Sequence, residues 1–312
     1  PSDVAVILIS VYLEHVKFSK KTSYGRIQVF EFLFPFTNIG TRQPPQSSQS
    51  TKISNSFAAK ASPLCKAAFS GDLELASKLI QDGEDVNLLS FSNVTPLILA
   101  ALFGHADAVK TLVENGANVN AKSVEGISPL HAVCYHGHLE AAKALLTDQC
   151  NINAKDNTGT TPLFLAAMNG HVGIVRALLD IATIDINAKS QTGLMPLHVA
   201  AHNKHLDVLK VLLDAGAPID VLTDFIHSPL HVAIRLSNRE VMVKLLVERG
   251  ANVNATTNQS VTPLHFAAGI GSSAVANYLL DKGAVVDFLE HSGKTALCPR
   301  FPHDFRFAEE RN

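Results

Sequence analysis

A short motif, usually Thr or Ser followed by Pro and Leu, recurs through most of this chain at a nearly constant interval. Its prolines are separated by 33, 33, 33, 34, 33 and 34 residues and stand at Pro63, Pro96, Pro129, Pro162, Pro196, Pro229 and Pro263. A further copy, Thr295-Ala296-Leu297, carries alanine in the proline position. A fixed period of this size is typical of stacked helical repeats, in which each unit contacts only its neighbours. The chain is therefore expected to form an elongated array.

One unit, which starts after the turn Asp-Asn-Thr-Gly at residues 156–159, shows what each repeat is expected to form. Thr161 favours a helix N-cap, and the proline after it suits the first helical turn, where its missing N–H costs nothing. The apolar spacing over 163–167 predicts a short helix that ends at Gly170. A second apolar stripe over 172–179 predicts another helix. Two such short helices cannot bury their apolar faces alone, so neighbouring copies must cover them.

The strings TPLFLAAMNGHVGIVRALL, MPLHVAAHNKHLDVLKVLLDAGAPID and TPLHFAAGIGSSAVANYLLDKGAVVD resemble ankyrin repeats. The resemblance covers seven complete units and part of an eighth, about three-quarters of the chain. It implies an all-α fold of helical repeats with short β-hairpin fingers, stacked into an ankyrin-type curved solenoid. It also implies protein partners, because that is what the family binds.

The repeats depart from the pattern in places. The glycine of the finger is replaced by Asn93, Ile226 and Ser260, and the glycine between the two helices becomes Lys204 in unit five and Ser237 in unit six. Asparagine tolerates a positive φ, whereas isoleucine does not, so the finger before Pro229 is expected to have another shape. Units five to seven are therefore predicted to be the least regular.

The pattern divides the chain into four parts. Residues 1–36 share nothing with the repeats, 37–57 form a flexible Pro/Ser/Gln linker by composition, 58–297 form the array, and 298–312 form an irregular tail. The apolar stretch VAVILISVYL imitates part of a secretory signal. It follows an acidic residue, lacks a cleavage site, and belongs to a chain that starts with proline, so a fragment or an imperfect gene model is the preferred interpretation.

Composition argues against several classes of function. The formal net charge is −2 and no basic stripe is evident, so no nucleic-acid partner is predicted. No uncharged apolar run is long enough to span a membrane, so no membrane insertion is predicted. The four cysteines form no CxxC pair, which favours reduced thiols and a cytoplasmic location, with the nucleus as a second compartment. No obligate oligomer is expected.

Eight of the 14 histidines follow the repeat period, which favours structural roles over metal or catalytic ones. One set follows Pro-Leu and the other starts each second helix: His131, His198, His231 and His265, then His105, His138, His171 and His205. The first set resembles the family's histidine that ties adjacent units together. Serines near these histidines occupy helix-cap positions. No catalytic residue, cofactor or metal site is predicted.

The resemblance implies that the two residues after each alanine pair face the concave groove, where partners bind. The predicted partner-binding residues are Phe69, Leu102, Phe103, Tyr135, His136, Met168, Asn169, His202, Asn203 and Arg235, with Phe91 and Val94 on the adjoining finger. Exposed aromatic and large apolar side chains are common binding hot spots. Two alternatives stay open: the N-terminal segment covers this track, or some of these side chains fill the space between units.

The function predicted is non-catalytic protein recognition as a scaffold or adaptor. The alternative is that the chain is a regulatory or substrate-recruiting region of a larger enzyme, channel or ubiquitin-ligase subunit. A full-length transcript distinguishes them, because only the alternative requires a catalytic, transmembrane or cullin-box segment beyond this sequence.

The ends of the units also carry a possible modification site. Asparagines at the unit ends resemble the ankyrin sites that an oxygen-dependent asparaginyl hydroxylase modifies: Asn87, Asn120, Asn153, Asn187 and Asn254. The preferred interpretation is simpler, namely that each side chain hydrogen-bonds the turn backbone.

Overall fold

Each repeat folds into two antiparallel helices joined by a short turn, as the computed structural model shows for residues 61–90, 93–223, 227–236, 240–291 and 293–296. The first helices of the units are α4 (Pro63–Ser70), α6 (Pro96–Leu102), α8 (Pro129–His136), α10 (Pro162–Met168), α12 (Pro196–His202), α14 (Pro229–Ile234) and α16 (Pro263–Gly269). The second helices are α5 (Leu73–Gln81), α7 (Ala106–Glu114), α9 (Leu139–Leu145), α11 (Val172–Leu179), α13 (Leu206–Asp214), α15 (Glu240–Glu248) and α17 (Ser273–Asp281).

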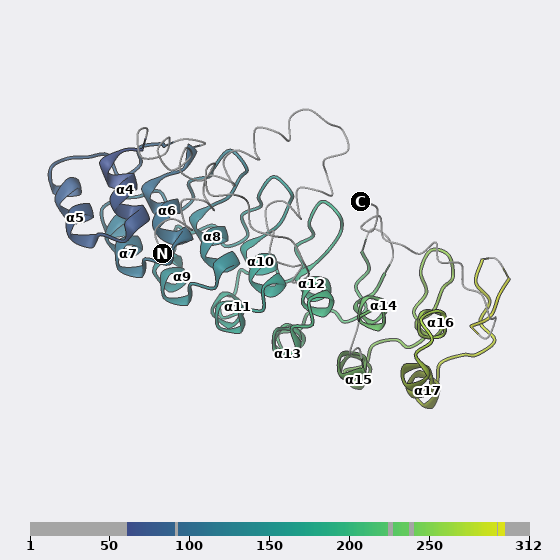
Figure 1. The fold of residues 1–312 in the computed structure, drawn as a ribbon. Coiled ribbons are helices and arrows are strands. Elements are labelled where there is room, and N and C mark those ends of the chain that lie inside the picture. The colour runs from purple at the N-terminus through teal and green to yellow at the C-terminus, as the bar shows by residue number, and fades with distance from the viewer. Residues whose placement is uncertain (1–60, 91–92, 224–226, 237–239, 292, 297–312) are drawn as a thin grey trace, which may run out of the picture.

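The units stack side by side into one curved array (Figure 1). The first helices form one row and the second helices a parallel row, while the loops between units project from the side of the first row. We call the helices of the two rows inner and outer, respectively, and the loops fingers. The order of elements and their stacking confirm the predicted all-α ankyrin-type solenoid.

The recurring Thr or Ser starts each inner helix as an N-cap. In unit four, Thr161 Oγ1 accepts a hydrogen bond from the backbone N–H of Phe164, and five other units have the same bond from Ser or Thr. In unit five, Met195 stands at this position and makes no side-chain cap. The cap satisfies one of the N–H groups that a helix start leaves unpaired, which explains why the residue type recurs with the period.

Each finger is closed by a backbone hydrogen bond across five residues. Examples are Ser123 N–H to Ile127 O at 3.0 Å and Asp156 N–H to Thr160 O at 3.1 Å. Successive fingers also join, since Asn157 N–H donates to Glu125 O. The described fingers contain no residue in regular strand, so the predicted hairpins are tight turns.

The core runs unbroken along the array between the two rows of helices. The leucine after each motif proline is buried in every unit, and so are the alanine pairs of units one, two, four and five. In unit seven Ala267 is buried but Ala268 is exposed. Small side chains at these positions let the inner helices approach closely, and the leucines fill the space toward the outer helices.

Three of the irregular positions take the backbone conformation that glycine has in other units, and Ile226 and Ser237 lie outside the described residues. Asn93, Lys204 and Ser260 adopt positive φ angles of 60°, 65° and 60° where other units have glycine. The finger before Pro229 keeps the closing bond, from Thr223 N–H to His227 O. Helix α14 has only 6 residues, in line with the irregularity predicted for units five to seven. The predicted segments 1–36, 37–57 and 298–312 also lie outside the described residues.

Candidate partner-recognition surface

Histidines at the start of the outer helices fix the ends of the inner helices that carry the predicted groove residues. His105 Nε2 donates to Phe69 O at 3.0 Å, and His138 Nε2 donates to Leu102 O at 3.2 Å. His171 and His205 bind Tyr135 O and Met168 O in the same way, at 2.9 and 3.0 Å. Each histidine thus reaches back to the preceding unit, which orients the side chains at the end of its inner helix.

These histidines lie against the inter-helix glycines of the preceding units. A Cβ on Gly104 would stand 2.4 Å from His138 Nδ1, and one on Gly71 would stand 2.5 Å from His105 Nδ1. Both glycines have a φ of +72°. Glycine is therefore required at this position for two reasons: the backbone is left-handed, and the histidine ring occupies the space that a Cβ would need.

Aromatic side chains of units one to three form clusters at the groove positions. The rings of Phe69 and Phe103 meet edge to face with centroids 4.8 Å apart, and Phe103 also stacks on His105 at 6.3 Å. Tyr135 and His136 meet edge to face at 4.8 Å. The four partly buried residues of this track, which we call the aromatic track, are Phe69, Leu102, Phe103 and Tyr135. The Phe69–Phe103 contact joins units one and two. It therefore supports the alternative interpretation in which some of these side chains fill the space between units.

Two predicted groove residues are not exposed. Val94 is 8% exposed and Met168 is 7% exposed, so the prediction that both present surface to a partner is wrong. Val94 closes its finger by accepting from Ser90 N–H, which turns its side chain into the core. Met168 ends an inner helix whose neighbours cover it on both sides. Phe91 lies outside the described residues.

The polar groove residues, from His136 of unit three to Arg235 of unit six, are partly or wholly exposed. His136 and His202 are exposed, while Asn169, Asn203 and Arg235 are half-buried. Asn169 Nδ2 donates to Leu165 O at 3.0 Å within its own helix, and Asn203 Nδ2 donates to Met168 O of the preceding unit at 2.7 Å. The surface therefore changes from aromatic in units one to three to polar in units four to six.

Comparison with known proteins identifies the architecture. A family model described as ankyrin repeats (3 copies) matches residues 22–123, 118–190 and 197–290. The chain belongs to the ankyrin repeat family. The crystal structure of the human ASB11 ankyrin repeat domain is similar, with 31% sequence identity, a TM-score of 0.61, and coverage of 72% of this chain and 99% of that one. The comparison with curated proteins gave no significant match.

The first family match begins at residue 22, ahead of residue 58, where the sequence pattern places the start of the array. Residues 1–60 lie outside the described part of the chain, so the boundary at residue 58 stays a prediction. From residue 61 onward the described helices follow the ankyrin pattern.

Buried Ser–His pairs in the ankyrin units are capping structures. Ser128 Oγ lies 2.7 Å from His131 Nδ1 and also accepts from His131 N–H, while Nδ1 accepts from Ser128 N–H. His131 Nε2 then donates to Thr160 O of the next unit. Both side chains are almost wholly buried, so no substrate reaches them. The geometry confirms the prediction that these serines are caps and that the histidine joins adjacent units.

Other chemistry finds little support in the described residues. They contain no group of three or more residues able to hold a metal ion, and no helix among them could cross a bilayer. Burial raises the pKa of Cys134, and it raises the pKa of Cys150 to about 11, so both thiols stay protonated. Cys65 and Cys134 are buried and Cys150 is half-buried, and none of the three forms a disulfide among the described residues.

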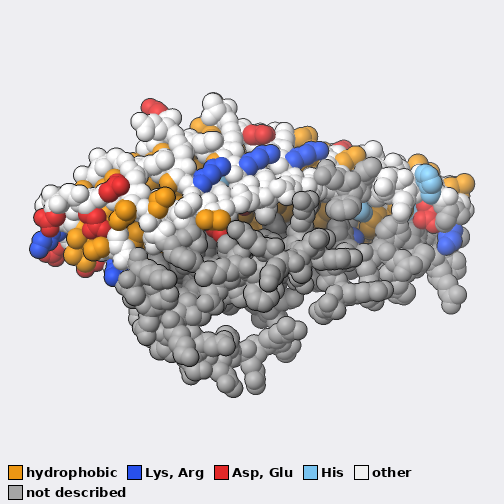
Figure 2. Space-filling view, turned by 90° about the horizontal axis from the view of Figure 1, so that it is seen from above, with side chains coloured by type: hydrophobic (Ala, Val, Ile, Leu, Met, Phe, Trp, Pro, Cys, Tyr) orange, Lys and Arg blue, Asp and Glu red, His pale blue; other side chains and the backbone are white. Residues whose placement is uncertain are grey.

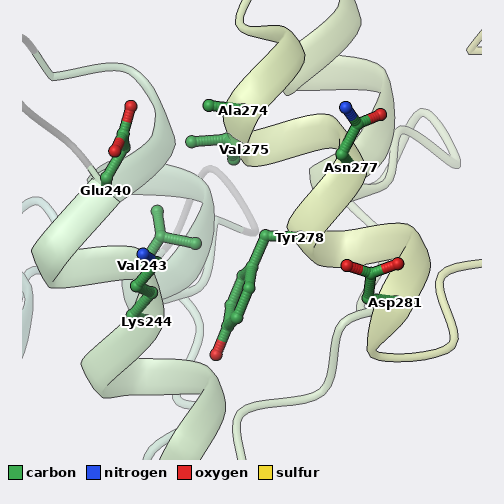
Figure 3. A pocket seen from close by; sticks show the side chains of 8 residues that line it. All are labelled: Glu240, Val243, Lys244, Ala274, Val275, Asn277, Tyr278 and Asp281. Carbon is green, nitrogen blue, oxygen red and sulfur yellow. The ribbon is translucent and has the colours of Figure 1, made fainter.

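A small hollow separates the last two outer ankyrin helices, α15 and α17 (Figure 3). The Tyr278 ring projects into it, with Lys244 Nζ 5.9 Å from the ring centre and Lys282 Nζ 5.7 Å away. Its volume, about 180 Å³, lies below the few hundred Å³ of ordinary small-molecule sites. The hollow is therefore a gap between repeats rather than a ligand pocket.

Asparagines at the ends of the ankyrin units bridge neighbouring units instead of closing their own turns. Asn120 Nδ2 donates to Gln149 O at 2.7 Å, and its Oδ1 accepts from Asn151 N–H at 2.7 Å. Equivalent bridges are made by Asn87, Asn153 and Asn254. Asn187 shows no such bridge in the described residues, because the next unit has Pro218 where an N–H is needed. Hydroxylation of the five asparagines stays a prediction, tested by intact-mass analysis for added oxygen atoms.

Proposed function

We propose that this ankyrin array is a non-catalytic scaffold or adaptor that binds a protein partner through the aromatic track and the adjoining fingers. The observation that carries the proposal is the half-exposed cluster of Phe69, Leu102, Phe103 and Tyr135 on consecutive units. Rigid aromatic side chains that are partly solvated and held in place commonly anchor protein interfaces.

The support for the proposal lies in the way these residues are held. Three of the four have their backbone carbonyls bound by a histidine of the next unit. A surface whose side chains are already ordered loses less conformational entropy on binding than a mobile one. Partner recognition is also what the ankyrin family generally does.

The test is affinity capture from cells with the full chain as bait, followed by the double substitution Phe103→Ala and Tyr135→Ala. Each aromatic anchor is expected to contribute about 2 kcal/mol or more to binding, so the double variant should lose the captured partner. The matched control replaces two exposed apolar residues of outer helices, Leu75→Ala and Val241→Ala. Circular dichroism checks that both variants keep their helices. Unchanged capture by a folded groove variant contradicts the proposal.

The adaptor role is preferred to that of a regulatory region within a larger protein because the proposed site needs only the array. Sequencing of full-length transcripts tests this choice, since a catalytic, transmembrane or cullin-box segment would favour the regulatory role. We also propose a cytoplasmic location, with the nucleus as a second compartment, and fractionation of cells with an antibody to the array tests it.

A further inference from the structure

The finger side of the array carries a row of lysines that lies apart from the aromatic track. Lys122, Lys155 and Lys189 hold the same position in three consecutive units, two residues after the unit-end asparagine. All three are exposed. Figure 2 views this side and shows basic side chains aligned along the long axis of the array.

The backbone of the next unit holds the first two of these lysines, Lys122 and Lys155, in line. Lys122 Nζ donates to Lys155 O at 2.9 Å, and Lys155 Nζ donates to Lys189 O at 3.0 Å. Each ammonium group has three N–H donors, so these contacts leave two of them for a ligand. The positive charges therefore repeat with the spacing of the units, and part of their side-chain entropy is already lost before any ligand binds.

Acidic side chains do not neutralise the row. The ion pairs found among the described residues involve Lys110, Lys143, Lys210 and Arg249, all outside the row. The acids of the same fingers are engaged elsewhere: Glu125 accepts from Ser123 Oγ, and Asp156 accepts from Thr158 and Thr160. The row thus presents a positive field on a chain whose net charge is −2.

Apolar side chains continue the row at both ends. The residues at the equivalent position of the flanking units are Leu89, 58% exposed, and Leu222, 39% exposed. In five consecutive units this position is therefore occupied by a leucine, three lysines and a second leucine, in that order. A phosphate group supplies only negative charge, whereas a peptide can supply carboxylates and apolar side chains together.

We propose that this row binds an extended acidic segment of a partner protein, with a carboxylate at every third residue and an apolar side chain beyond each end. Adjacent packed helices lie about 8–10 Å apart, which sets the spacing of the lysines. A polyproline II segment rises about 3.1 Å per residue with three residues per turn, so every third side chain points the same way at about 9 Å. The inference rests on the proposed protein-recognition function and defines the chemistry of the partner on the finger side.

The first experiment measures binding of a labelled peptide, Leu-x-x-Glu-x-x-Glu-x-x-Glu-x-x-Leu with Pro and Ser at x, to the full chain by fluorescence anisotropy. The pattern reads the same in both directions, so its orientation need not be known. The control peptide has Gln in place of Glu. The Glu peptide should bind roughly tenfold tighter or more at low salt, and the difference should shrink as salt rises. Equal binding of the two peptides overturns the proposal.

The second experiment reverses the charges of the row. Lys122→Glu, Lys155→Glu and Lys189→Glu together should weaken binding of the Glu peptide roughly 20-fold. The matched control reverses Lys110, Lys143 and Lys210, which lie exposed on outer helices and give the same change in net charge. An equal loss in the control shows that only net charge matters, and it contradicts the site.

Two further measurements separate this inference from its alternatives. The variant with Phe103→Ala and Tyr135→Ala should bind the peptide as the parent chain does; a matching loss would mean that the peptide occupies the groove and would overturn the finger site. Single-stranded DNA of random sequence should bind weakly, and tighter binding through the same lysines would assign the row to nucleic acid instead. If a captured partner needs the groove but not the lysines, this inference fails while the proposed function stands.

Discussion

Units one to five and units six to seven are built from the same repeat but joined in different ways. At the four junctions within units one to five, an outer-helix histidine lies over the glycine of the preceding unit and binds its inner helix. At the next junction the glycine is replaced by Lys204, and Gly271 of unit seven has no atom near the place of a Cβ. Every unit has the core leucine and every unit but unit five has the side-chain cap, so the main difference lies in the junctions.

The comparison shows that the inter-helix glycine is a property of the junction rather than of the unit. A left-handed backbone alone can be adopted by other residues, as Lys204 demonstrates with a φ of 65°. Glycine becomes necessary where the next unit brings a histidine ring to the same place. The N-terminal region should therefore be the more cooperative of the two.

The largest expected difference concerns opening of the stack at its C-terminal end. Unit seven lacks the histidine contact, and its Ala268 is exposed where the equivalent residues of units one, two, four and five are buried. Hydrogen exchange of the full chain should show free energies of opening about 5 kcal/mol lower from Thr262 onward than in units three and four. Equally slow exchange in both places would show that the chain beyond the described residues covers the stack.

Acid should destabilise both regions, because buried histidines lie on either side of the junction between units five and six. Burial lowers the pKa of His198, in unit five, to about 4 and that of His231, in unit six, to about 4. Their unfolded pKa is about 6.5, so the unfolded chain binds more protons between these values and stability falls as pH drops from 6.5 toward 4. At pH 5 each should lower the free energy of unfolding by about 2 kcal/mol relative to pH 7.

Urea denaturation at pH 7 and pH 5 measures this loss, and hydrogen exchange locates it. Replacement of both histidines by Gln serves as the control, because the pair can then no longer titrate. His131 and His136 of unit three also have their pKa lowered, mainly by desolvation, so part of the loss should remain in the variant. A variant as acid-sensitive as the parent chain would assign the effect to other groups.

The smallest expected effect separates the two kinds of glycine. Gly104→Ala should lower the free energy of unfolding by about 3 kcal/mol, because the left-handed backbone is strained and the His138 contact is lost. Gly271→Ala meets no neighbour and should lower it by only about 1 kcal/mol. Urea denaturation gives both values.

A double-mutant cycle with His138→Ala should recover part of the loss at Gly104, because the ring that the new methyl group meets is then absent. When His138→Ala is combined with Gly271→Ala, the two losses in the free energy of unfolding should add. Additivity at both glycines would contradict the role assigned to the histidine.

Much of the fold could be predicted from the sequence because its determinants recur locally. The Thr-Pro-Leu motif encodes a cap, a first helical turn and a core leucine within three residues, and repetition makes that signal easy to detect. The Gly104–His138 contact could not be predicted, since it joins residues of adjacent units whose separate positions already have local explanations.

The candidate site was less predictable because exposure depends on the neighbouring units. Met168 and Tyr135 stand at equivalent positions, yet Met168 is buried and Tyr135 is only half-buried. The lysine row was also missed, since three lysines spread over 68 residues do not change the overall charge balance. Only the stacking of the units brings Lys122, Lys155 and Lys189 into line.

The contact between glycine and histidine determines where along the array repeats can be removed or inserted. If unit two, three or four were removed, the new junction would again place a glycine against a histidine. Such shortened arrays should therefore assemble without further substitutions. Unit five differs, because it carries a histidine toward its N-terminal neighbour and a lysine toward its C-terminal one. It is a transition module, and gene duplications or designed insertions can be placed before it far more freely than across it.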